Sequence, residues 1–142
     1  MDCNKIFLDA NILLDFLNQN RPNHKSAHKL LYFLELNSYS MVISEDMITN
    51  IFYIEKNKKN VLNFLNDIIL NGWIISPFGK EVITNAIDLS LKNNLDLEDT
   101  LQCLCAKENQ CEVLITNDKK FYDCGISVYS INEFLDKQKE LK

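Results

Sequence analysis

The sequence has few of the residues that make tight turns. It holds only three glycines and two prolines in 142 residues, which argues against a turn-rich all-β sandwich, and no serine-, glycine- or proline-rich stretch suggests a linker. A 46% share of hydrophobic residues is enough for one sizeable core. We therefore expect a single domain over residues 1–142, built mainly of helices.

Long hydrophobic runs are also absent. The first apolar run, Ile6 to Leu8, is too short for a signal peptide or a membrane span, so we expect a cytoplasmic protein with no membrane partner. The five cysteines are odd in number and contain no Cys-x-x-Cys pair, which predicts buried thiols without disulfides or zinc. His24 and His28 have a spacing that can bind zinc, but no third ligand is found, and we interpret them as part of a solvent-facing helix surface.

The net charge of −5 argues against a nucleic-acid ligand, because phosphate binding usually needs a basic surface. This objection holds unless the carboxylates bind divalent ions, which reverse the local electric field. The lysine clusters, such as Lys56, Lys58 and Lys59, are typical of solvated helix faces. Charge alone therefore leaves the class of ligand open.

The hydrophobic pattern alternates between strands and helices. It predicts strands at 5–8, 39–43, 72–76, 112–116 and 127–129, and helices from residue 10, over 24–37, 45–58, 60–70, 80–92 and 96–108, from residue 119, and at the C-terminus. Ser44 is expected to be the N-cap of the helix that follows it. Strands that are apolar throughout and alternate with helices predict a three-layer α/β/α fold with a central, mainly parallel sheet of about five strands.

Ligands of such sheets bind beyond the carboxyl ends of the strands, where the strand order reverses. Asp9 follows the first predicted strand and Asp118 follows the fourth, so both should lie at one edge of the sheet. Asp99 lies early in a helix whose residues 100–106 carry no charge, and we expect that helix to be buried nearly all round. Each acid taken alone could be a helix cap, and Asp96 fits that role well.

Three converging carboxylates without a catalytic histidine predict a Mg²⁺ or Mn²⁺ site, because these hard ions prefer oxygen ligands. Asp9, Asp99 and Asp118 are the candidate metal ligands and catalytic residues, with Glu98 as a further ligand. Asn11 and Thr116 are expected to orient the acids or metal-bound waters. The chemistry that such a site favours is hydrolysis of phosphodiester bonds.

The residues around these acids resemble the acidic motifs of PIN-domain nucleases. The resemblance rests on four segments that span most of the chain: 6–14, 43–54, 97–102 and 115–121. It implies a metal-dependent endoribonuclease with an RNA substrate. Many small bacterial members are VapC-like toxins that a cognate antitoxin holds inactive and that commonly form homodimers, so a small antitoxin protein and a homodimer are expected here.

One position departs from the family pattern. Six residues after Ser44 the family usually has an acid, and this sequence has Asn50. A subgroup with Thr-Asn-Ile-Tyr-Tyr is similar to residues 49–53, whereas the alternative interpretation makes Asn50 a hydrogen-bonded core amide. Glu45, Asp96 and Glu98 are the acids that could compensate, and Tyr53 is a candidate substrate contact.

Two other functions compete with the nuclease. The first is a PIN-like module that has lost catalysis and serves in binding or assembly. The observation that suggests it is Asn50 in place of the usual acid. The second is a phosphoacceptor receiver domain, which would need an acid at the end of the third strand, where this sequence has Ser76-Pro77. Function belongs to the site rather than to the fold, so fold similarity alone licenses none of these choices.

Overall fold

A five-stranded parallel sheet forms the centre of the molecule. The computed structural model describes residues 4–118 and 124–140. The strands are β1 (Lys5–Leu8), β2 (Ser40–Ser44), β3 (Ile74–Ser76), β4 (Val113–Ile115) and β5 (Ser127–Tyr129). Their order is β3-β2-β1-β4-β5, and every neighbouring pair is parallel. The strand order therefore reverses between β1 and β4, which makes their carboxyl ends the switch point of the sheet.

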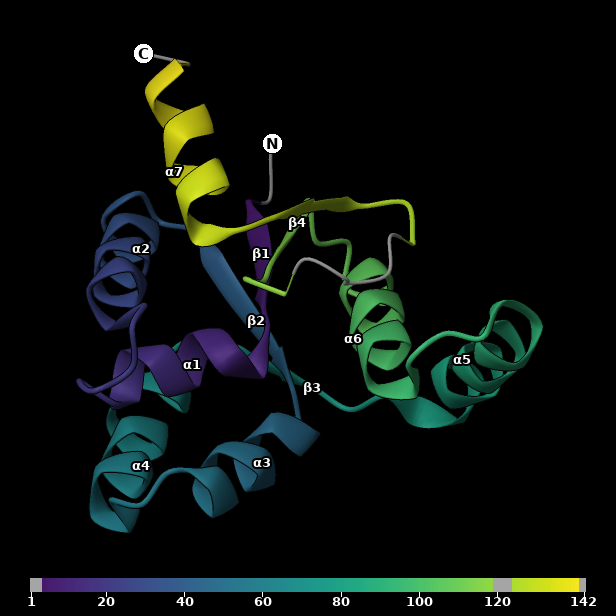
Figure 1. Cartoon of the computed structure of the whole chain (residues 1–142), viewed down its shortest axis with the longest axis horizontal. Coiled ribbons are helices and arrows are strands. Elements are labelled where there is room, and N and C mark those ends of the chain that lie inside the picture. The colour runs from purple at the N-terminus through teal and green to yellow at the C-terminus, as the bar shows by residue number, and fades with distance from the viewer. Residues whose placement is uncertain (1–3, 119–123, 141–142) are drawn as a thin grey trace.

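Helices cover both faces of this sheet, so the predicted α/β/α fold is confirmed. They are α1 (Ala10–Leu17), α2 (His24–Leu36), α3 (Asp46–Ile54), α4 (Lys58–Phe64), the π-helix η1 (Leu65–Ile69), α5 (Gly79–Asn93), α6 (Leu97–Glu108) and α7 (Ile131–Glu140). Figure 1 shows α1 and α2 on one side of the sheet and α5 and α6 on the other. The helix α6 packs on β2 and β4, and α5 packs on α6.

The core fills the space between these layers. Ile6, Phe7 and Leu8 of β1 are buried on both faces of the sheet, as expected for a central parallel strand. In α6 no residue from Thr100 to Ala106 is exposed, which confirms the prediction that this uncharged helix is buried nearly all round. None of the helices in the part of the chain that the structure describes is long and apolar enough to cross a membrane.

Two predictions around the second strand are wrong. The helix predicted over 45–58 ends at Ile54, and α4 starts separately because the Asn57 side chain caps it by accepting a hydrogen bond from the Asn60 N–H at 3.1 Å. Ser44 is not the N-cap of α3, because it is the last residue of β2 and its hydroxyl donates to the carboxylate of Asp46 instead. The helix predicted from residue 119 begins outside the described residues.

The prediction that the cysteines are all free thiols is also wrong. Cys103 on α6 forms a disulfide with Cys124, which precedes β5, and their Cα atoms are 6.0 Å apart. Cys105 and Cys111 are buried free thiols, as expected. The pair is 21 residues apart in the sequence, and the tertiary structure, in which α6 packs on β4, brings the two side chains together.

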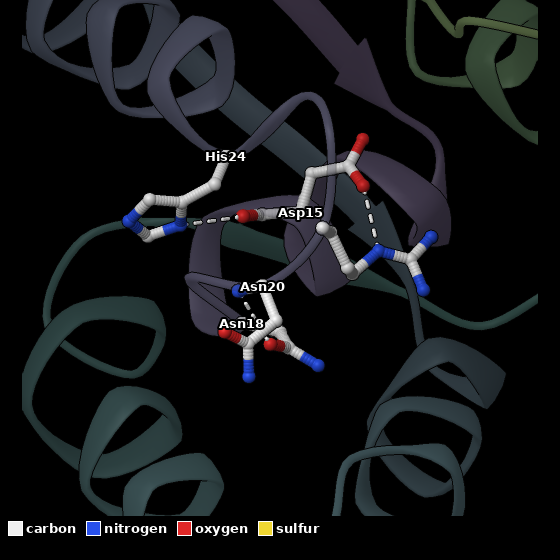
Figure 2. A network of polar contacts seen from close by, with 5 residues as sticks. Asp15, Asn18, Asn20 and His24 are labelled. Carbon is white, nitrogen blue, oxygen red and sulfur yellow. Dashed lines mark hydrogen bonds and ion pairs between the residues drawn. The ribbon is translucent and has the colours of Figure 1, made fainter.

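The two histidines of α2 do more than face solvent. Their ring nitrogens lie within hydrogen-bonding distance of two carbonyl oxygens in the last turn of α1: His24 Nδ1 is 2.9 Å from that of Asp15, and His28 Nε2 is 3.1 Å from that of Phe16. Carbonyls at a helix C-terminus have no partner within the helix, so these rings satisfy them. Figure 2 shows the contact between His24 and Asp15.

Candidate active site at the switch point of the sheet

Asp9 and Asp118 meet around a single threonine. Asp9 follows β1, is only 6% exposed, and its carboxylate accepts a 2.8 Å hydrogen bond from the hydroxyl of Thr116, which follows β4. The same hydroxyl accepts a 3.0 Å hydrogen bond from the backbone N–H of Asp118. Thr116 therefore connects the Asp9 carboxylate to the backbone of Asp118 through one hydroxyl.

Asp99 reaches this edge of the sheet from the first turn of α6. Asp96 is the N-cap, as predicted: its carboxylate accepts a 3.0 Å hydrogen bond from the Asp99 N–H. The Thr100 hydroxyl donates to the Asp96 carbonyl at 2.7 Å and tightens the same turn. The cap thus holds the start of α6 in place, and the half-buried Asp99 carboxylate lies close to the N-terminal end of the helix.

The charges of these acids act on one another. Burial raises the pKa of Asp99 to about 6, and the negative charges of Asp96, Asp118, Asp9 and Glu98 add to the effect. Burial also raises the pKa of Asp9, and the charge of Asp118 adds to it, whereas the Thr116 hydroxyl acts in the opposite direction. The negative charges of Asp9 and Asp118 therefore both act on Asp99, and a shared ion between the three carboxylates stays a prediction.

The structure adds Asp46, an acid that the sequence analysis missed. The pKa of Glu98 is raised by burial and then by the charges of Asp46, Asp9 and Asp96. Asp46 is the first residue of α3 and is held by the Ser44 hydroxyl. It lies one helical turn before Asn50, and that four-residue spacing is the signal that could have identified it.

The other sequence candidates take different places. Glu45 is exposed, and its charge is not among those that act on Asp9, Glu98 or Asp99. Asn11 is exposed in the first turn of α1, and Asn50 is half-buried. Within the described chain the Asn50 side chain has no hydrogen-bond partner, so the structure does not support a core amide. Tyr53 is exposed, which leaves its ring accessible.

Gln102 is the last residue of the acidic motif at 97–102, and the sequence assigns it no role. It is fully buried one turn after Asp99, and in the described part of the chain neither polar atom of its side chain has a hydrogen-bond partner. A buried amide without partners is costly. Gln102 therefore marks the flank of α6 below Asp99 as a place where a water or ligand would be favoured.

The donor set fits a hard divalent cation. It consists of carboxylates, and neither Asp9, Glu98 nor Asp99 forms an ion pair with a described lysine or arginine. Within residues 4–118 and 124–140, however, no three acids, histidines or cysteines are already arranged to hold an ion. Mg²⁺ tolerates this, because it keeps several waters and commonly takes only one or two carboxylates directly from the protein.

A polar cavity of about 620 Å³ adjoins Asp118. Its lining includes Thr116, Asn117 and Asp118 at the end of β4, and Ser130 and Asn132 between β5 and α7. The Asn117 side chain accepts a 3.2 Å hydrogen bond from the Ile131 N–H, which fixes the start of α7 against this rim. Asp118 therefore lies beside a space lined in part by amide and hydroxyl groups that can hydrogen-bond a polar ligand.

Comparison with known proteins agrees with this architecture. Residues 5–120 match the family model described as PIN domain. The chain is 36% identical over 141 residues to Ribonuclease VapC1 of Aquifex aeolicus (strain VF5), an alignment that covers 96% of this chain and 97% of the relative.

Solved structures show the same fold. Mycobacterium tuberculosis VapC20, described as a sarcin-ricin loop cleaving toxin, matches with a TM-score of 0.69 at 11% identity and covers 85% of this chain and 95% of its own. A toxin-antitoxin complex from Klebsiella pneumoniae matches with a TM-score of 0.66 at 19% identity, and the match covers 89% of this chain and 97% of that chain. VapBC2 of Rickettsia felis, bound to a promoter DNA fragment, matches with a TM-score of 0.65 at 19% identity, and the match covers 87% of this chain and 96% of that chain. From the family model and the 36% identity together, this chain belongs to the PIN-domain family.

Proposed function

We propose that this protein is a metal-dependent endoribonuclease that hydrolyses RNA phosphodiester bonds, and that it is the toxin of a toxin-antitoxin pair. The observation that carries the proposal is that the Thr116 hydroxyl donates to the Asp9 carboxylate and accepts from the Asp118 N–H at the switch point of the sheet, and the charges of both acids act on Asp99. The 36% identity to a ribonuclease over nearly the whole chain supports the same activity.

In this proposal Asp9, Asp99 and Asp118 hold Mg²⁺ or Mn²⁺, with Glu98 as an additional ligand. The bound ion would neutralise phosphate charge, lower the pKa of a water ligand and stabilise the leaving oxygen. Thr116 keeps Asp9 in a fixed orientation through its hydroxyl, and the capped turn of α6 does the same for Asp99. Hydrolysis joins the water oxygen to phosphorus, breaks one P–O bond and leaves a proton on the departing sugar oxygen.

Asp46 is proposed to supply the negative charge that Asn50 lacks. Its charge already acts on Glu98, and Ser44 restrains it at the start of α3. The variant Asp46→Asn should therefore weaken cleavage, and Asn50→Asp should be tolerated. If Asp46→Asn cleaves RNA like the wild type, Asp46 has no part in the site.

The partners follow from the same proposal. An antitoxin is expected because two structural neighbours are toxin-antitoxin assemblies. A homodimer is expected because Ile83, Ile87 and Leu91 form an exposed apolar stripe on α5. Sedimentation of the wild type and of Ile87→Glu tests the homodimer: the variant should shift toward monomer, and a wild type that is monomeric at high concentration would refute it.

The activity test uses the full chain purified free of any antitoxin. Structured RNA should be cleaved with Mg²⁺ or Mn²⁺, and cleavage should stop when a chelator removes the metal. The variant Asp88→Asn is the matched control, because Asp88 is an exposed acid that pairs with Lys92 on α5. A wild type that cleaves no RNA with either ion would favour the competing function, a PIN-like binding module without catalysis.

A further inference from the structure

A second polar cavity, of about 540 Å³, lies at the other end of α1. The eight residues of α1 separate it from Asp9 by about 12 Å along the helix. Its walls come from the end of α1, the start of α2, and the helices α4 and η1. Figure 2 shows the turn between α1 and α2 on this side, where Asn18 accepts a hydrogen bond from the backbone N–H of Asn20.

Glu55 lines this cavity and is only 7% exposed. Among the described residues the one hydrogen bond to its carboxylate comes from the Asn57 N–H, at the long distance of 3.5 Å. In the described chain no lysine or arginine forms an ion pair with it. Lys58, three residues away, donates instead to the carbonyls of Phe52 and Tyr53. Glu55 is therefore a buried carboxylate without a cationic partner, which is costly unless a ligand supplies one.

The other residues that line the cavity also favour a cation. No lysine or arginine of residues 4–118 and 124–140 lines the cavity, and Asp67 adds a second negative charge. Asn57, Asn60 and Asn63 supply amide oxygens that can accept hydrogen bonds. These groups favour a cation with several N–H donors and disfavour a phosphate.

Aromatic rings form part of the wall. The rings of Phe16 and Phe64 lie 5.3 Å apart, and the His28 ring stacks on Phe16 at 4.2 Å. A planar guanidinium stacks on such rings and donates to a carboxylate through two parallel N–H groups, whereas an ammonium is a compact point charge that does neither.

We propose that this cavity binds a guanidinium group, which pairs with Glu55 and stacks on the wall formed by Phe16 and Phe64. The group is presented either by a free small guanidine or by an arginine side chain of a peptide. Both sources share one chemistry, and neither involves the carboxylates at the switch point.

The test is a titration of the full, metal-saturated chain, followed by calorimetry and thermal melting. Agmatine represents a free guanidine and N-acetyl-arginine amide represents a peptide arginine, with urea as the uncharged analogue and butylamine as the ammonium. We expect agmatine to bind and to raise the melting temperature, butylamine to bind more weakly, and urea to have no effect at equal concentration. Binding of N-acetyl-arginine amide as well identifies a peptide arginine, and binding of agmatine alone identifies a free guanidine.

Three variants locate the binding. Glu55→Gln keeps the side-chain shape and should weaken agmatine binding roughly tenfold or more, because a charge-assisted hydrogen bond is lost. Asn63→Arg, at an exposed position of the lining, should block the cavity with its own guanidinium. Glu81→Gln removes an exposed acid of α5 and should bind agmatine like the wild type.

The acids at the switch point also attract cations, so Asp99→Asn is included. Agmatine binding that survives Glu55→Gln but is lost in Asp99→Asn would overturn the proposal, as would urea that binds as well as agmatine. Because no RNA is present, failure of this site and failure of the proposed ribonuclease activity are separate results.

Discussion

The helix α1 has a buried carboxylate at each end, and the two have opposite surroundings. Asp9 at its start is 6% exposed and Asp15 in its last turn is 4% exposed. The Asp15 carboxylate accepts a 2.7 Å hydrogen bond from the Arg21 guanidinium, which supplies a compensating charge from within the chain. Asp9 instead has a hydroxyl from Thr116 and the negative charge of Asp118 beside it.

This difference separates a structural acid from a functional one. Burial alone does not do so, because both carboxylates are equally withdrawn from water. The Asp15 pair is complete within the folded chain and needs no ligand. The acids around Asp9 gain from an external cation, since each added negative charge makes the next one costlier. The following predictions test this contrast, from the largest expected effect to the smallest.

The largest effect should come from removing one charge at the switch point, with Asp15 at the other end of α1 as the comparison. Asp99→Asn and Asp9→Asn should abolish metal-dependent RNA cleavage without unfolding the protein, because ligands of one ion act as a unit. Asp15→Asn should keep the activity at low temperature but lower the free energy of unfolding by about 1–3 kcal/mol, since it weakens a charge-assisted bond. Cleavage assays and denaturant unfolding separate the two outcomes. An active Asp99→Asn protein would remove the contrast.

The next prediction concerns the disulfide near the switch point. Cys103 lies one turn after Asp99, and Cys124 lies six residues after Asp118, so the bond connects the two segments that carry these acids. Its loss should lower the stability by about 3 kcal/mol from chain entropy for a loop of this length. Unfolding of the oxidised and reduced wild type measures the difference, and the double variant Cys103→Ser with Cys124→Ser should show no further change on reduction. Equal stability of the two wild-type forms would contradict the prediction.

Metal addition should stabilise the wild type through binding linkage. A concentration one hundred times the dissociation constant adds about 2.7 kcal/mol to the free energy of unfolding. The melting temperature should therefore rise with millimolar Mg²⁺ or Mn²⁺ in the wild type and in Asp15→Asn, and stay unchanged in Asp9→Asn. A wild type whose melting temperature does not respond would argue against a metal site.

The smallest effect concerns pH in the absence of metal. The pKa of Asp99 is raised from 3.8 to about 6, so the folded state binds more protons than the unfolded state between these values. The contribution of Asp99 to stability should therefore fall as the pH rises from about 4 to about 6 and stay constant above. The stability of wild type minus that of Asp99→Asn, measured by urea unfolding across this range, isolates the effect. A difference that does not change with pH would show that Asp99 is not desolvated.

The elements could be predicted well where a local pattern decides them. The strand β1 and the helix α6 follow from the sequence because Ile6 to Leu8 are all apolar and residues 100–106 carry no charge, as burial on all sides requires. The helix break at residues 55–57 does not follow from the sequence, because residues 55–60 contain no glycine or proline to mark a helix end, and only the structure shows the Asn57 side chain capping α4. Ser44 was misread for a similar reason: a serine after a strand is a common cap, and only its neighbour Asp46 gives its hydroxyl a stronger acceptor.

The acidic residues also divide into those that a local sequence pattern predicts and those that only tertiary packing places. Asp9 and Asp118 follow adjacent parallel strands, and strand order places the residues after such strands together whatever the helices do. Asp46 and the bond from Cys103 to Cys124 depend on how α3 and α6 pack on the sheet, so no spacing along the chain reports them directly.

By itself, the sequence determined the alternation of strands and helices, the parallel sheet and the edge at which the acids lie, because hydrophobic period and position after a strand are local properties. Only the tertiary structure decided which carboxylates have a cation beside them. Arg21 reaches Asp15 across the turn between α1 and α2, whereas Asp9 and Glu55 have no such partner in the described chain. The cost of a buried charge depends on everything packed around it, and the packing brings those groups from distant parts of the chain.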